Sequence, residues 1–189
     1  MQTVKIIRDP SPENPRESWD NLGTMAAEHR RYALGDKRGH AKLAELLGCE
    51  ADDYRRISER LEKRRDIIAL PLYLYDHSGI TISTTPFSCP WDSGQVGFIF
   101  VTAEKVRAEY NWKVITKARR AKVEDYLRGE VETYDQYLVG DVFGFQIEDD
   151  EGEGDSCWGF YGRNPETNGI LDYLPPELHA AAIEAARHV

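Results

Sequence analysis

Cysteine is scarce in this chain of 189 residues, and its spacing favours no bonded framework. Cys49, Cys89 and Cys157 are odd in number and form no C-x-x-C metal pair. No apolar run approaches the roughly 18 residues that a membrane span requires. The first residues, MQTVKIIRDPSPENP, turn to charge and proline too soon for a signal peptide. We therefore expect a reduced, cytoplasmic protein.

Several recognition motifs are missing as well. The chain has no Gly-rich phosphate loop, no zinc-finger spacing, no RNA-stacking motif and no repeat of fixed period. Basic residues gather over 55–65 and 113–122, but acidic residues lie within or beside both segments, as is typical of solvated helix faces. The sequence thus predicts no metal, no cofactor, no membrane contact and no direct contact with nucleic acid.

Negative charge is in excess, and the excess lies in one stretch. Residues 130–162 contain ten of the 33 acidic residues and no Lys or Arg, which leaves 23 acidic against 24 basic residues elsewhere. A concentrated anionic field repels nucleic acid and attracts cationic surfaces. A solvated acidic turn that aids solubility is the alternative explanation.

The composition is globular, with 41% hydrophobic and 11% aromatic residues, and the length suits one domain. Strand patterns occupy 3–7, 72–76, 80–83, 96–101, 142–147 and 157–162. Helical patterns occupy 24–34, 40–47, 52–69, 103–110, 114–138 and 177–188. The sequence therefore predicts an α+β fold: a mostly antiparallel sheet of four to six strands built from hairpins, with helices on one face and a C-terminal helix. We expect a single domain over 1–189, in which residues 1–36 form a loosely attached arm or part of the core.

Two local signals set boundaries within this pattern. Pro71 is expected to end the helix over 52–69, because the residue before a proline avoids helical geometry. Thr102 is expected to cap the helix that follows it, because its side chain can accept a hydrogen bond from a free backbone N–H group.

The segment 70–101, LPLYLYDHSGITISTTPFSCPWDSGQVGFIFV, is the most distinctive part of the chain. Its core, LYLYDHSG…FSCPWDSGQVGFI, resembles a family of small uncharacterised proteins encoded by bacteriophages and other mobile elements. The resemblance extends loosely to 22–36 and to the motifs GDVFGF and DSCWGFYG. It implies a phage or mobile-element accessory protein and carries no activity to transfer.

Asp76, His77 and Cys89 form the enzyme candidate in this segment. A thiol beside an imidazole that a carboxylate orients is the general arrangement of an activated cysteine nucleophile. A small hydrolase or transferase built this way should alkylate faster at Cys89 than at Cys49 and Cys157. The alternative is architectural, because DHSG suits a tight turn and Cys89 can serve as a small buried side chain.

Two segments echo each other around a tryptophan. SCPWDSG, residues 88–94, and SCWGFYG, residues 156–162, both place a Ser-Cys pair near a Trp and a Gly. If they lie on neighbouring strands, Trp91 and Trp158 should stack. Such a pair is either packed in a core corner or forms a rigid aromatic face that a partner recognises.

These observations favour a protein that acts by binding a host protein. Small acidic proteins of mobile elements can inhibit nucleic-acid-targeting defences by presenting carboxylates where a nuclease expects phosphates, and we expect that role here. The Cys/His enzyme and a structural or packaging component are the alternatives. The candidate partner-binding residues are Glu148, Asp149, Asp150, Glu151, Glu153, Asp155, Trp91, Asp92 and Trp158.

Overall fold

The computed structural model describes residues 2–49, 54–149 and 154–189. The chain divides into two compact units. The terminal unit comprises Met1–Pro15 with Asp135–Val189, and the central unit comprises Arg16–Tyr134. The division falls inside the long helix α5. The expectation of one domain over 1–189 stays a prediction.

The central unit is built on a four-stranded antiparallel sheet in the order β2-β5-β3-β4. Its strands are β2 (Thr24–Ala27), β3 (Ile67–Asp76), β4 (Ile80–Ser83) and β5 (Ser93–Thr102). Its helices are α1 (Pro15–Ser18), α2 (Gly39–Leu47), α3 (Tyr54–Lys63), α4 (Ala103–Tyr110) and α5 (Lys117–Val139).

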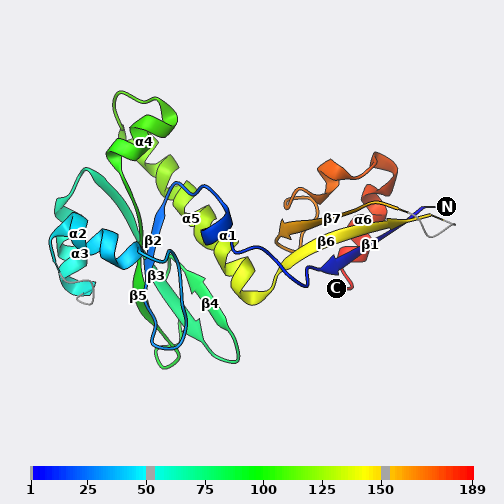
Figure 1. Ribbon diagram of the computed structural model, residues 1–189, viewed down its shortest axis with the longest axis horizontal. Coiled ribbons are helices and arrows are strands. Elements are labelled where there is room, and N and C mark those ends of the chain that lie inside the picture. Colours follow the sequence, from blue (N-terminus) through cyan, green and yellow to red (C-terminus); the bar gives the residue numbers. More distant parts are fainter. Residues whose placement is uncertain (1, 50–53, 150–153) are drawn as a thin grey trace. The chain divides into compact units, whose positions relative to one another are not determined.

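The two faces of this sheet carry different helices (Figure 1). On one face, Leu43 of α2 and Ile57 of α3 pack in a buried cluster with Phe98 and Phe100 of β5. On the other face lies α5, whose buried Val123 and Leu127 are among its core residues. Because strand side chains alternate between faces, a strand that is covered on both sides reads as a nearly continuous apolar run, and β5 does so.

The terminal unit is a three-stranded antiparallel sheet in the order β1-β6-β7 with short helices packed against it. The strands are β1 (Thr3–Arg8), β6 (Val142–Glu148) and β7 (Ser156–Tyr161). The helices are η1 (Ile170–Tyr173), η2 (Pro176–Leu178) and α6 (His179–Ala186). Phe143 and Ile170 are fully buried in its core, beside Ala182 of α6.

The predicted fold class is confirmed: the protein is α+β, and its strand pairs are antiparallel. The described strands form two sheets, of three and four strands, where the sequence suggested one. Helices were expected on one face, whereas α2 and α3 cover one face of the four-stranded sheet and α5 covers the other. The hairpin around residues 77–79 is confirmed, with Asp76 opposite Ile80. The Thr102 cap is also confirmed, since its Oγ1 accepts a hydrogen bond from the Lys105 backbone N–H at 3.3 Å.

The helix predicted over 24–34 is wrong. Residues Thr24–Ala27 form β2, which pairs with β5, and the chain then leaves regular structure. Met25 and Ala26 are completely buried there. A Cβ atom on Gly97 of β5 would lie 1.8 Å from the Ala26 carbonyl oxygen, so the two backbones approach closely. Tertiary packing of small residues therefore overrides their helix propensity.

The helix predicted over 52–69 is too long, and Pro71 does not end it. Residues 52 and 53 lie outside the described part, α3 ends at Lys63, and β3 begins at Ile67. Pro71 stands inside β3, opposite Phe98. Ile67 and Ile68 are both buried because β3 is covered on both faces, and this two-sided burial makes a strand look like a helix segment in sequence.

A buried ionic cluster ties residues 16–36 to α5. The Arg16 guanidinium lies 2.8 Å from Asp36 and 2.9 Å from Glu130, and its side chain is only 1% exposed. Glu130 also accepts hydrogen bonds from the backbone N–H groups of Leu22 and Gly23. Burial opposes the charge on Arg16, but the two carboxylates outweigh it and raise the pKa of the guanidinium.

In the described ranges, no helix combines the length and the apolar character that crossing a bilayer would demand.

Candidate binding surface on the DHSG and CPWDS loops

The two motif loops of the central unit meet at one end of its sheet. The DHSG turn joins β3 to β4, and the CPWDS loop leads into β5, so both lie where these strands start or finish, at the lower end of the sheet in Figure 1. The Asp76 backbone N–H donates to the Asp92 carbonyl oxygen at 2.8 Å. We refer to Asp76, His77, Cys89, Trp91 and Asp92 as the loop surface.

The Asp92 carboxylate joins the two loops through side chains. Its Oδ2 lies 3.2 Å from Nδ1 of His77 and accepts a hydrogen bond from the Cys89 thiol at 3.7 Å. The Ser93 hydroxyl donates to the Cys89 carbonyl oxygen. Ser78 adopts a left-handed conformation, with φ of 58°, in the turn beside His77. The conformation of both loops is thus fixed by contacts among their own residues.

Asp76 has different partners from those the sequence suggested. Its carboxylate forms an ion pair with Arg31 and accepts a hydrogen bond from the Tyr32 hydroxyl at 3.3 Å. The Arg31 guanidinium also lies over the Tyr32 ring, 5.4 Å from its centre. The carboxylate beside His77 is therefore that of Asp92, and Asp76 anchors the loop that follows β2.

Aromatic side chains support the base of the loop surface, and one projects from it. The Tyr75 ring stacks on His77, with centres 5.9 Å apart, and packs against Phe87 at 5.7 Å. Trp91 is 90% exposed, more than any other large hydrophobic residue among those described. A fixed loop thus holds a large apolar ring in water, which is uncommon unless something else covers it.

The order of the contacts among Cys89, Asp92 and His77 limits the chemistry of this arrangement. The carboxylate stands between the thiol and the imidazole, whereas an activated cysteine needs the imidazole beside the sulfur. A neighbouring carboxylate also disfavours a second negative charge on a thiol. In the ranges that the structure describes, no three His, Cys, Asp or Glu side chains form a group that could hold a metal ion.

The acidic candidates of the terminal unit lie around the β6–β7 connection. Glu148 ends β6 and forms an ion pair with Lys5 at 2.7 Å. Asp149 and Asp155 are exposed and line an open hollow of about 580 Å³ with Tyr173. Asp150, Glu151 and Glu153 lie outside the described residues.

Part of the acidic stretch is neutralised by basic residues from elsewhere. Glu130 is paired with Arg16 and is 8% exposed, and Asp141 lies 3.4 Å from Arg8. The charge that this stretch presents to solvent is therefore smaller than its sequence count indicates.

The two tryptophan segments do not lie on neighbouring strands. Trp91 precedes β5 in the central unit, whereas Trp158 belongs to β7, which pairs with β6 in the terminal unit. Trp158 is 38% exposed and covers Gly144, where an added Cβ atom would lie 2.3 Å from its ring. The similarity of the two segments therefore does not reflect a shared contact. Trp158 packs over Gly144, where the missing side chain leaves room for its ring, and Trp91 lies in another unit.

Sequence reasoning missed the residues that contact Asp76 and His77 and support the loop surface. The sequence pattern predicts a helix at Arg31 and Tyr32, and it indicates only a strand at Tyr75 and a loop at Phe87. The HRRY run, residues 29–32, was the available signal against a helix. Two consecutive arginines beside a tyrosine do not continue the pattern of small apolar residues that precedes them. Their position beside Asp76 depends on β2 pairing with β5.

Comparison with models of protein families, with curated proteins and with solved structures finds no match to this chain.

Proposed function

We propose that this protein acts by binding a host protein, as an accessory protein of a bacteriophage or another mobile element. The loop surface is the contact region in this proposal, and Trp91 is its anchor. The exposed ring of Trp91 supports it best, because a large apolar ring gains free energy when a partner removes it from water, and tryptophan is enriched among the residues that dominate protein interfaces.

Charge supports a cationic partner. Asp92 is 40% exposed beside Trp91, and Asp149 and Asp155 are exposed in the terminal unit. The protein as a whole carries a net charge of −9. Rim carboxylates of this kind raise the association rate with a basic surface and make it sensitive to salt. A nucleic-acid-binding channel of a defence nuclease fits that chemistry, and inhibition of such a nuclease is the role we propose.

The test is capture of host proteins on immobilised wild-type and variant chains. Trp91→Ala should remove the specifically captured protein, whereas Tyr126→Ala, which removes an aromatic ring that is 49% exposed elsewhere in the central unit, should not. Capture should weaken steeply between about 50 and 500 mM salt. Equal capture by the Trp91 and Tyr126 variants would rule out the loop surface as the contact region.

The acidic contribution is tested separately. Reversing the charge at Asp149, Asp150, Glu151 and Glu153 should abolish inhibition of the captured nuclease, and thermal unfolding of the variant is the control for its folding. A charge-reversed chain that still inhibits as the wild type does would contradict the mimicry of phosphates.

A small Cys/His enzyme is the second candidate, because one carboxylate oxygen lies within 3.7 Å of both the Cys89 thiol and the His77 imidazole. The loop would have to move so that His77 replaced Asp92 beside the sulfur. This candidate requires Cys89 to alkylate faster than Cys49 and Cys157. Slow and equal labelling of the three thiols would exclude it.

A further inference from the structure

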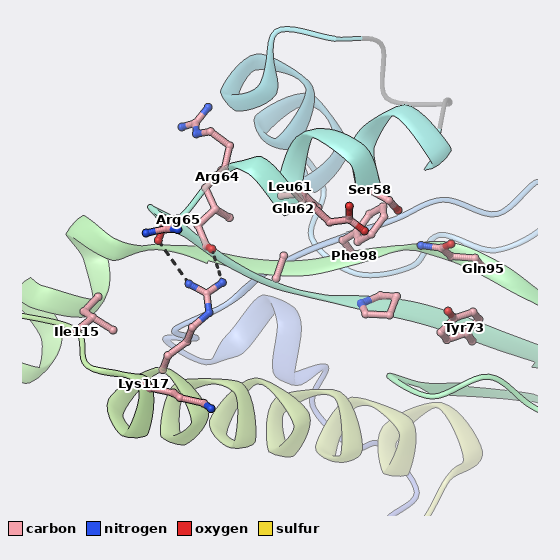
Figure 2. A pocket seen from close by; sticks show the side chains of 14 residues that line it. Ser58, Leu61, Glu62, Arg64, Arg65, Tyr73, Gln95, Phe98, Ile115 and Lys117 are labelled. Carbon is pink, nitrogen blue, oxygen red and sulfur yellow. Dashed lines mark hydrogen bonds between the residues drawn. The ribbon is translucent and has the colours of Figure 1, made fainter.

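A cleft of about 930 Å³ follows the outer edge of β3 in the central unit (Figure 2). The helix α3 borders it on one side and the beginning of α5 on the other. A cavity of this volume is large enough for a small organic ligand. Since β4 pairs only with Tyr73–Asp76, none of the described strands lies beside the first half of β3 on this side.

The free edge of β3 is closed to an added strand. The register with β5 and the hydrogen bond from Ala103 to Asp66 direct the backbone groups of Ile67 and Pro71 away from β5. Arg120 already donates to the Ile67 carbonyl oxygen at 2.8 Å, and Pro71 has no N–H group to offer. An occupant of this cleft is therefore recognised through side chains, and not as an extra strand.

One end of the cleft is cationic. Arg65, Lys117 and Arg120 line it there. Arg120 donates to the backbone carbonyl oxygens of Arg65 and Ile67, and it also forms an ion pair with Glu124 at 3.3 Å. Among the described residues, the side chains of Arg65 and Lys117 have no ion-pair or hydrogen-bond partner. A smaller cavity of about 180 Å³ shares these three residues and adds Arg107. Two unneutralised cations beside a fixed guanidinium favour a phosphate group.

The other end is aromatic and polar. Tyr73 and Gln95 face each other across the β3–β5 pair, and both line the cleft, as does the Pro71 ring. The Gln95 amide nitrogen donates to the Gly97 carbonyl oxygen at 3.3 Å, which orients its oxygen as an acceptor. A planar heterocycle with N–H donors on its edge suits such a place. Glu62 of α3 lies between the two ends and disfavours a phosphate there.

We propose that this cleft binds a nucleoside polyphosphate, with its phosphates at Arg65, Lys117 and Arg120 and its base at Tyr73 and Gln95. The six residue steps from Ile67 to Tyr73 span about 20 Å at roughly 3.3 Å each, which favours a chain of phosphates over a single one. A nucleic-acid strand would place phosphates along the whole cleft, including beside Glu62. The site goes beyond the binding function proposed for the loop surface and does not depend on it.

Titration calorimetry with the full chain tests this assignment. The four ribonucleoside triphosphates, inorganic triphosphate and a short single-stranded oligonucleotide serve as probes. The double variant Arg65→Ala/Lys117→Ala should weaken binding of the preferred triphosphate roughly tenfold or more. Tyr73→Thr should weaken it roughly fivefold or more. Lys63→Ala is the matched control, because this exposed lysine of α3 does not line the cleft.

Each outcome decides the assignment. Preferential binding of a nucleoside triphosphate that the first two variants weaken and Lys63→Ala does not would support it. Absence of binding at millimolar triphosphate would overturn it, as would equal affinity for inorganic triphosphate or tighter binding of the oligonucleotide. If Tyr73→Thr fails to fold by thermal unfolding, Gln95→Ala replaces it with the same expectation.

Discussion

The Oδ2 atom of Asp92 lies 3.2 Å from Nδ1 of His77, although Asp76 is the acidic residue next to His77 in sequence. The same oxygen accepts a hydrogen bond from Cys89. If this carboxylate only fastens the two loops, Asp92→Ala should make Cys89 alkylate roughly threefold to tenfold faster, because the thiol loses both a partner and a neighbouring negative charge. Iodoacetamide labelling followed by mass spectrometry measures the rate.

Asp76→Ala is the control for that experiment, since it leaves the contacts of Asp92 in place. A slower reaction of Cys89 in Asp92→Ala would instead mean that the carboxylate assists the thiol, and it would favour the enzyme over the binding protein.

Removing Arg16 from the buried ionic cluster should strongly destabilise the central unit. Arg16→Ala leaves Asp36 and Glu130 without their cation in a site where Arg16 is 1% exposed, and we expect a loss of about 3–5 kcal/mol in the free energy of unfolding. Arg55→Ala, which breaks an exposed pair with Glu59, should cost about 1 kcal/mol or less. Urea unfolding followed by circular dichroism compares the two, and equal losses would contradict this expectation.

Two glycines of β5 provide a matched test of the β2–β5 contact. An added Cβ atom at Gly97 would lie 1.8 Å from the Ala26 carbonyl oxygen, whereas at Gly94 it would meet nothing within 4 Å. Gly97→Ala should therefore destabilise the fold by roughly 1–3 kcal/mol, and Gly94→Ala should leave it nearly unchanged. Thermal unfolding measures both. If Gly97→Ala unfolds at the same temperature as the wild type, β2 does not pack against β5 as described.

Asp66 should titrate unusually low. Hydrogen bonds from Arg64 lower the pKa of Asp66 from 3.8 to about 2. Because the pKa is lower in the folded state, the stabilisation is present above about pH 4 and is lost as the pH falls towards 2. The side chain is 61% exposed, so the effect on stability is small. An NMR titration should show the low pKa in the wild type and a value near 3.8 in Arg64→Gln.

The sequence was sufficient where a signal was local. The DHSG hairpin, the Thr102 cap and the apolar run of β5 depend on neighbouring residues, and each was predicted. It failed over 24–34 and at Pro71. In both places a strand forms because a partner distant in sequence buries it, and propensity alone contains no information about that partner.

The candidate site was predicted in composition but not in connectivity. The sequence located His77, Cys89 and Asp92 in one loop region, yet it assigned Asp76 to the imidazole. The loop after β2 places Arg31 beside Asp76, and the two form an ion pair. Asp92 is therefore the carboxylate that contacts His77. The cleft beside β3 was not anticipated. Arg65 lies in the turn between α3 and β3 and Lys117 begins α5, whereas the sequence placed both in basic helical segments that are usually only solvated.

Hydrogen exchange of the chain, alone and with its captured partner, tests the central claim most directly. If the loop surface is the contact region, protection should rise over residues 76–93 and should be absent in Trp91→Ala mixed with the same partner. Protection that appears elsewhere in the chain while 76–93 exchange as in the free protein would contradict the account.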